Sequence, residues 1–190
     1  AVFMRTQFNA TATGENNFKI IGLYQLMLQL HEQAGNRNMM ARYDADRIDW
    51  ANKNSQFANK AGVYHSALNQ LLQYNHPTIS ARALYLQASS EMDRGSTYEP
   101  FRDTTNRYAL NDALKIIDTA KQLLGEAIWG QNGFHRLYQQ INSVFLSGNI
   151  EKTNLPDQPF RALIRYQNLN TVYARIYPLH SREFLRNNYL

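Results

Sequence analysis

The chain has 190 residues, a formal net charge of +5, 44% hydrophobic residues and 18% charged residues. These values are typical of a globular protein of one or two domains with a substantial core. The absence of cysteine excludes disulfides, thiolate catalysis and cysteine-based zinc sites. No run of apolar residues is long enough to predict a membrane-spanning helix.

The positive charge is concentrated near the C-terminus. Residues 161–190 contain five arginines and a single acid, Glu183, so the first 160 residues are nearly neutral. Arg161 and Arg165 fall on the polar side of an alternating pattern, which is where a strand carries solvated charges. We therefore expect no nucleic-acid partner, because such a partner requires a clustered basic patch.

Residues 1–15 show no hydrophobic period and predict a tail or an extended lead-in. A helix is predicted from an Asn16 cap to Gln33, and Gly35 suits the left-handed position that ends it. Apolar residues cover almost the whole circumference of this helix, which predicts packing on more than one side.

A second helix is predicted from Met39 to Asn54. Its polar side carries four charged residues, Asp44, Asp46, Arg47 and Asp49. A calcium loop needs a turn-forming glycine and a distal glutamate at fixed spacing, and neither is present. We interpret this side as solvated or paired with arginine, and we predict no metal site and no cofactor.

Four more helical segments follow, arranged as two antiparallel pairs. The first pair is Lys60 to Tyr74 and Ile79 to Asp93, with apolar residues at helical spacing. In the second pair one face runs from Ala109 to Ala120 and the other from Phe134 to Ile141. The two pairs repeat with an offset of 46 residues, whereas a tetratricopeptide repeat has about 34. The pattern indicates an irregular, tetratricopeptide-like array of α-hairpins, with a loop over 94–105.

After Ile141 the hydrophobic period changes from about 3.6 to two, which predicts β-strands. One strand is expected within Val144 to Lys152. A β-hairpin is expected over 160–176, with its turn at 167–170. The predicted fold class is thus mainly α, with a short antiparallel β segment from an incomplete β-sandwich. The predicted domains are 1–15, a tail or lead-in; 16–142, the helical repeats; and 143–190, the strands of the incomplete sandwich.

So few strands bury too little apolar surface to be stable alone. We therefore expect the chain to be a piece of a longer protein, cut inside a β-domain. We also expect four strand residues to lack part of their cover: Phe160, Ile164, Val172 and Ile176.

Six residues in this region fit a two-strand pattern, in which Tyr-x-Asn-Leu ends one strand and Tyr-x-Arg-Ile belongs to the next: Tyr166, Asn168, Leu169, Tyr173, Arg175 and Ile176. With its proline-containing lead-in, the run from Asn149 to Pro178 resembles the opening of the first macroglobulin-like domain in large bacterial alpha-2-macroglobulin-family proteins. Some of those proteins carry a tetratricopeptide-like region just before that domain. The family comprises endopeptidase inhibitors that trap proteases, often with a reactive thioester, and this cysteine-free chain contains no thioester.

The sequence offers no catalytic, metal-binding or cofactor-binding constellation. Its five histidines are scattered and form no metal-ligand pair, and no glycine-rich phosphate-binding motif occurs. The histidines are His31, His65, His76, His135 and His180. Trp50 and Trp129 could line a glycan- or peptide-binding groove, but helical repeats also use such residues for core packing.

The predicted function is a non-enzymatic scaffold or docking segment of an alpha-2-macroglobulin-like protein in the bacterial cell envelope, either periplasmic or anchored to the outer membrane through the parent protein. Its expected partners are proteins: the rest of the parent chain, and a protease or an envelope protein. One alternative is a helical-repeat adaptor that binds a protein or peptide. The other is a glycan-binding outer-membrane lipoprotein.

Overall fold

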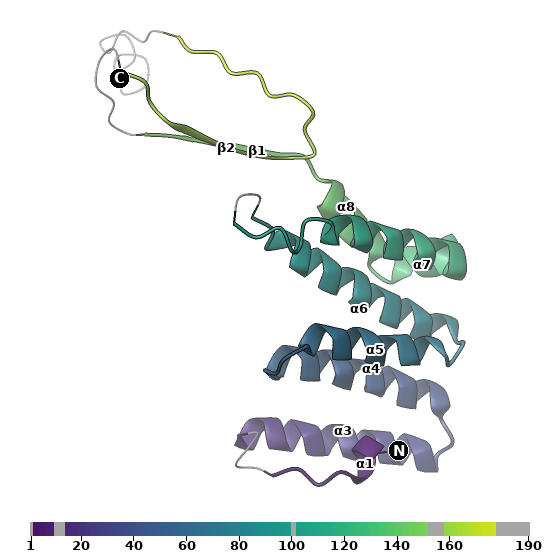
Figure 1. Ribbon diagram of the computed structural model, residues 1–190. Helices are drawn as coiled ribbons and strands as arrows, with labels where there is room; N and C mark the ends of the chain where they lie inside the picture. The colour runs from purple at the N-terminus through teal and green to yellow at the C-terminus, as the bar shows by residue number, and fades with distance from the viewer. Residues whose placement is uncertain (1, 10–13, 100–101, 152–157, 178–190) are drawn as a thin grey trace, which may run out of the picture. The chain divides into compact units, whose positions relative to one another are not determined.

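A computed structural model describes residues 2–9, 14–99, 102–151 and 158–177. The chain forms two compact units, Ala1–Ile141 and Asn142–Leu190. Within the described residues the first unit is helical and the second contains an antiparallel strand pair, which confirms the mainly-α fold class with a short β segment (Figure 1). The helices are α1 (Val2–Arg5), α3 (Glu15–Gln33), α4 (Arg37–Asn54), α5 (Lys60–Leu72), α6 (Pro77–Ser96), α7 (Ala109–Gln131) and α8 (Phe134–Asn142).

The helical unit is a stack in which each helix from α3 to α7 contacts the next, and α4 also contacts α6 (Figure 1). Helix α6 is central to the packing because it contributes to both apolar clusters. One cluster joins α4, α5 and α6 around Leu68, and the other joins α6, α7 and α8 around Phe134. Alanines on α4, α6 and α7 are completely buried, which allows these helices to approach closely.

The predicted helices are present, and their ends have local causes. Helix α4 begins two residues before the predicted start because Asn36 caps it, with its Oδ1 accepting a hydrogen bond of 3.1 Å from the Met39 amide. The prediction that Asn16 caps the first helix is wrong: α3 begins at Glu15, after Gly14 at φ 72°. Gly125, at φ 74° and ψ 162°, interrupts the helical dihedrals inside α7.

The prediction of an extended lead-in is wrong for the first residues, because they include the one-turn helix α1. Met4 is only 7% exposed, and the segment contacts α3. Helix α3 is packed on the sides that face α1 and α4. Three leucines on a further side, Leu23, Leu26 and Leu30, remain 50–59% exposed, so the predicted packing around α3 is not complete among the described residues.

The second unit contains β1 (Phe145–Ile150) and β2 (Ala162–Gln167), paired antiparallel from Phe145 opposite Gln167 to Ile150 opposite Ala162. The first of these strands was predicted within Val144 to Lys152. The predicted hairpin over 160–176 is wrong, because β2 pairs with β1 and the described residues 168–177 form no strand. Asn168, at φ 55°, donates a side-chain hydrogen bond of 3.0 Å to the Ser143 carbonyl, so the end of β2 is tied to the start of β1.

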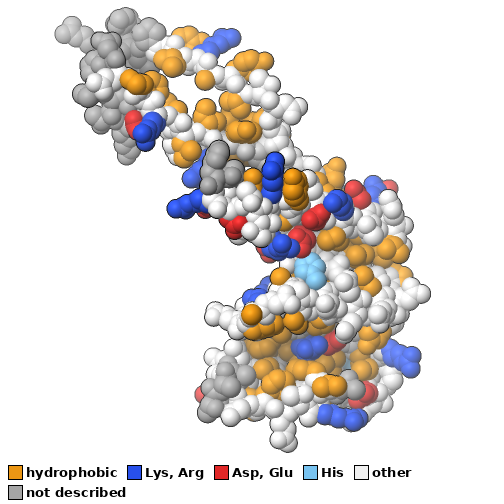
Figure 2. Space-filling view, viewed as in Figure 1, with side chains coloured by type: hydrophobic (Ala, Val, Ile, Leu, Met, Phe, Trp, Pro, Cys, Tyr) orange, Lys and Arg blue, Asp and Glu red, His pale blue; other side chains and the backbone are white. Residues whose placement is uncertain are grey.

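The register gives the strand pair one apolar face. Residues directly opposite each other in an antiparallel pair share a face, so Leu146 and Tyr166 lie with Ile150 and Ile164. The opposite face is mixed: Phe145 and Leu163 lie there with Arg165 and other polar residues. No described residue of this unit is buried, and hydrophobic side chains are visible on its surface (orange in Figure 2). Of the four residues expected to lack cover, Phe160, Ile164 and Ile176 are 41–80% exposed, and Val172 is half-buried.

Candidate functional site

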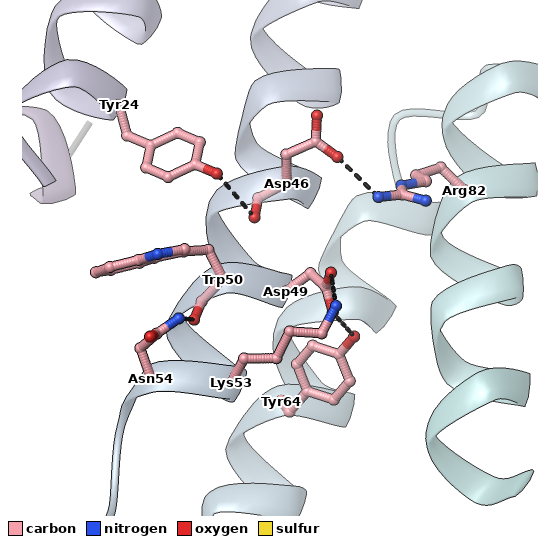
Figure 3. A network of polar contacts seen from close by, with 8 residues as sticks. All are labelled: Tyr24, Asp46, Asp49, Trp50, Lys53, Asn54, Tyr64 and Arg82. Atoms are coloured by element: carbon pink, nitrogen blue, oxygen red, sulfur yellow. Dashed lines mark hydrogen bonds and ion pairs between the residues drawn. The ribbon is translucent and has the colours of Figure 1, made fainter. Parts of the chain in front are cut away.

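Helix α4 carries a network of polar contacts toward α5 and α6 (Figure 3). Asp46 forms an ion pair of 2.9 Å with Arg82 of α6. Asp49 accepts a hydrogen bond of 3.1 Å from the Tyr64 hydroxyl of α5 and forms an ion pair of 2.8 Å with Lys53. The network therefore ties three helices together through two carboxylates.

The same helix reaches α3 on its other side. The Tyr24 hydroxyl donates a long hydrogen bond of 3.4 Å to the Asp46 carbonyl, and its ring lies 6.1 Å from that of Trp50 (Figure 3). Asp44 pairs with Arg47 at 2.7 Å. The predicted interpretation of this charged side as solvated or arginine-paired is confirmed for Asp44 and Asp46.

Both tyrosines of the network have a raised pKa. For Tyr64 the main cause is burial. The Asp49 carboxylate raises the pKa further, because it repels the phenolate and accepts a hydrogen bond from the neutral hydroxyl. For Tyr24 burial also dominates, followed by the charges of Asp46 and Asp49. Both hydroxyls are therefore protonated donors at neutral pH and are not available as general bases.

Two hollows flank the Asp46–Arg82 ion pair. The larger, of about 610 Å³, lies between the N-terminal halves of α4 and α6, and the smaller, of about 280 Å³, lies toward their C-terminal halves. Arg82 lines both. Arg42 lines the larger hollow and is exposed, and among the described residues no carboxylate pairs with it. We define this surface, the two hollows with Arg42, Asp46 and Arg82, as the α4–α6 groove.

A buried carboxylate lies between α5 and α6. Glu91 is 6% exposed and pairs with both its oxygens to Arg94 at 2.8 and 2.9 Å. The His65 Nε2 lies 3.1 Å from Glu91 Oε1, although the direction of its N–H does not complete a hydrogen bond. Because Arg94 neutralises the carboxylate and no hydroxyl or thiol nucleophile joins the group, we interpret it as a link between two helices.

The other histidines are dispersed. His31 stacks on Tyr43 with ring centroids 5.2 Å apart, and His135 lies edge-on to Trp129. His76 precedes α6, and His180 lies outside the described residues. Within the described ranges no three acidic or histidine side chains gather as a metal site would require. The structure thus brings none of the four described histidines together.

The two tryptophans do not form a shared platform. Trp129 is 9% exposed within the α6–α8 core cluster, where Lys121 lies 5.2 Å from its ring centroid. Trp50 is half-buried beside Tyr24. Trp50 also lines a hollow of about 380 Å³ with Asn17 and Asn54, and the glycan-binding alternative stays a prediction.

Sequence reasoning identified the α4 carboxylates but missed Arg82 and Tyr64 as their partners. Tyr64 was assigned to the core face of its helix, which is correct for its ring, and Arg82 of α6 stands between Ala81 and Ala83, which are both completely buried. A polar residue adjacent to a buried stripe carries a weak signal of an interhelical ion pair, but its partner depends on the packing of helices distant in sequence.

Comparison with models of protein families, with curated proteins and with solved structures gave no match. None of the helices over the described ranges is long and apolar enough to cross a bilayer.

Proposed function

We propose that this chain is a non-catalytic scaffold segment of a protein of the bacterial alpha-2-macroglobulin type, located in the cell envelope. In that role the helical unit is a rigid support, and β1 and β2 are the first strands of a β-sandwich. The partner is then the remainder of the sandwich, with a protease or envelope protein as the target of the whole protein.

The observation that carries this proposal is the uncovered apolar face of the strand pair. Leu146, Ile150, Ile164 and Tyr166 share this face and are 44–63% exposed. A sandwich buries such a face against a second sheet about 10 Å away. The opposite face is mixed, because it carries Arg165 and three other polar residues together with Phe145 and Leu163. Such an exposed face marks a surface that another element covers.

The helical unit supports the non-catalytic part of the proposal. Asp46 and Asp49 are used in links between helices, and the tyrosines of the polar network are protonated donors at neutral pH. Its packing is that of a stacked array in which successive helices share their apolar faces.

The test uses adjacent residues on opposite faces of β2. Because the chain has no cysteine, Ile164→Cys and Arg165→Cys each introduce a single thiol. We expect both thiols to react rapidly with a maleimide in the 190-residue chain. In the full-length product of the gene, position 164 should react at least about tenfold more slowly while position 165 stays reactive.

Equal reactivity of the two positions in the full-length protein would contradict the proposal, as would a reading frame that ends near Leu190. A second measurement addresses the scaffold role directly. The 190-residue chain is mixed with trypsin and casein, and hydrolysis should proceed at the rate seen without it. Inhibition by this chain alone would contradict a purely structural role.

A second candidate function is a helical-repeat adaptor, and the α4–α6 groove favours it. A peptide carboxylate could pair with Arg42, which has no acidic partner among the described residues. Peptides selected from a displayed random library should then bind the chain and lose about tenfold in affinity to an Arg42→Glu variant. Arg136→Glu, the same charge reversal at an exposed position of α8 that lines neither hollow, is the matched control. Peptides that bind both variants equally would exclude the groove.

A further inference from the structure

The N-terminal segment, residues 2–9, is held against α3 through its main chain. The Gln25 side-chain amide donates to the Phe3 carbonyl at 2.8 Å and to the Thr6 carbonyl at 2.7 Å. The Gln29 amide donates to the Met4 carbonyl at 2.9 Å. The two glutamines are four residues apart and so lie on one face of α3. Three side-chain hydrogen bonds thus bind main-chain carbonyl groups, which every peptide carries.

Side chains add two anchors to these carbonyl contacts. Met4 is 7% exposed, whereas its neighbour Val2 is 84% exposed. The Arg47 guanidinium of α4 lies 4.3 Å from the centroid of the Phe3 ring, a cation–π geometry. The side-chain contacts of this surface therefore favour a peptide in which an aromatic residue is followed by an unbranched apolar residue.

The segment depends on this surface for its conformation. Helix α1 has four residues, and a single helical turn is not stable in water on its own. Its turn is closed by the Thr6 hydroxyl, which donates to the Val2 carbonyl at 2.9 Å. Helix α3, by contrast, has 19 residues and packs on α4. The N-terminal segment is therefore bound to α3 as a ligand is bound to a preformed site.

We propose that the face of α3 around Gln25 and Gln29, with Arg47, is a peptide-binding site that the chain's own N-terminal segment occupies. Its ligand is a short peptide that forms one helical turn and carries an aromatic residue followed by methionine or a similar unbranched side chain. This inference is independent of the proposed scaffold function, because it concerns only contacts within the helical unit.

The covalent connection makes the bound segment a strong competitor. A tethered ligand acts at an effective concentration on the order of 1 mM, so a free peptide must be supplied at comparable concentration to displace it. Displacement would expose Met4 to solvent while leaving the α3–α4 packing in place. The exposure of position 4 is therefore a direct measure of site occupancy.

The experiment uses Met4→Cys as the only thiol of the 190-residue chain and follows its reaction with a maleimide. The free peptide Val-Phe-Met-Arg-Thr-Gln-Phe-Asn, at concentrations up to a few mM, should accelerate the reaction at least about threefold. The same peptide with aspartate in place of methionine should have no effect, because the buried position rejects a charge. Val2→Cys, at an exposed position, should react rapidly with or without peptide.

A second arm removes the carbonyl contacts. Gln25→Leu with Gln29→Leu in the Met4→Cys background should raise the labelling rate about tenfold without added peptide. Gln33→Leu, the same substitution at an exposed position of α3, should leave the rate unchanged. The proposal is overturned if free peptide leaves the rate at position 4 unchanged, if the glutamine pair has no effect, or if positions 2 and 4 react equally fast at the start. Should the double variant unfold by circular dichroism, the peptide arm decides alone.

Discussion

The two units of this chain differ in how far they bury their apolar residues. In the helical unit the large apolar residues Leu68, Leu71, Ile117 and Phe134 are at most 2% exposed, and each lies in a cluster shared by three helices. In the strand unit no described residue is buried, although β2 is as apolar as many core strands. The first unit supplies partners for most of its apolar faces, with the leucines of α3 as the exception, and the second presents a face without one.

The contrast follows from what each kind of element needs in order to bury its apolar face. A helix with an apolar stripe is covered when the chain turns back and packs another helix on it, which short connections achieve here. A strand pair satisfies its hydrogen bonds locally, but its apolar face needs a second layer. Stability of this chain should therefore reside in the helical unit, and four substitutions can break or sharpen that comparison.

The largest effect is expected from Phe134→Ala. Phe134 is completely buried, and its ring lies edge-on to Tyr85 at 5.8 Å. Truncation should lower the free energy of unfolding by about 3–5 kcal/mol, measured by urea titration with helical circular dichroism. The same substitution at Phe145, which is 50% exposed in β1, should change it by less than about 1 kcal/mol. Similar losses at both positions would refute the contrast.

A smaller effect is expected from Gly95→Ala at the end of α6. A Cβ atom there would lie 2.6 Å from the Leu110 side chain and 3.1 Å from the Leu110 backbone nitrogen. This overpacking should destabilise the chain by about 1–3 kcal/mol in the same titration. Gly22 of α3 is the matched control, because its Cβ would meet nothing within 4 Å. Gly22→Ala should stabilise the chain by about 0.5–1 kcal/mol, and equal signs would show that α6 and α7 are not closely packed.

Periodicity was sufficient to predict the helices and the fold class, because each helix from α3 to α8 carries its own apolar stripe. It was insufficient for the strands: residues 160–166 and 172–176 both alternate, but alternation does not say which strand pairs with which. The pairing of β2 with β1 depends on a register between Phe145–Ile150 and Ala162–Gln167, across the intervening residues 151–161. The same limit hid the Asp46–Arg82 pair, whose members come from different hairpins.

One missed feature did carry a signal. Gln25 and Gln29 stand four residues apart in a helix that is otherwise apolar around almost its whole circumference. Such a pair indicates a polar contact on that side of the helix. The one-turn helix that they hold could not be predicted, because four residues have no helical period of their own.

A third substitution, Tyr64→Phe, addresses the polar network and should lower the free energy of unfolding by about 1 kcal/mol at neutral pH. Tyr64→Phe removes the hydroxyl that donates to Asp49. It should also change the response to alkali. The pKa of Tyr64 is raised in the folded chain above its ordinary value of 10.0, so above about pH 10 the unfolded chain loses a proton that the folded chain keeps. The free energy of unfolding then falls as pH rises.

This alkaline slope should become shallower by up to about 1.4 kcal/mol per pH unit in Tyr64→Phe, measured by urea titrations between pH 8 and 11. Tyr24, whose pKa is also raised by burial, should account for part of the remaining slope. Tyr74→Phe is the control, because Tyr74 is 49% exposed. An unchanged slope in Tyr64→Phe would mean that its hydroxyl is accessible to water in the folded chain.

The smallest effect is expected in the strand unit, at Asn168. Its side chain donates to the Ser143 carbonyl, and its backbone has a φ of 55°, a conformation that alanine adopts at a cost. Asn168→Ala should therefore weaken the β1–β2 pairing by about 0.5–1 kcal/mol, read as faster amide hydrogen exchange in both strands. Asn168→Gly loses the same side chain but removes the strain, so its effect should be a few tenths of a kcal/mol. The helical unit should exchange at the same rate in both variants, because its clusters contain no residue of the strand unit. If exchange in α6 or α7 rose with that of the strands, the two units would unfold together, and the division of stability between them would be wrong.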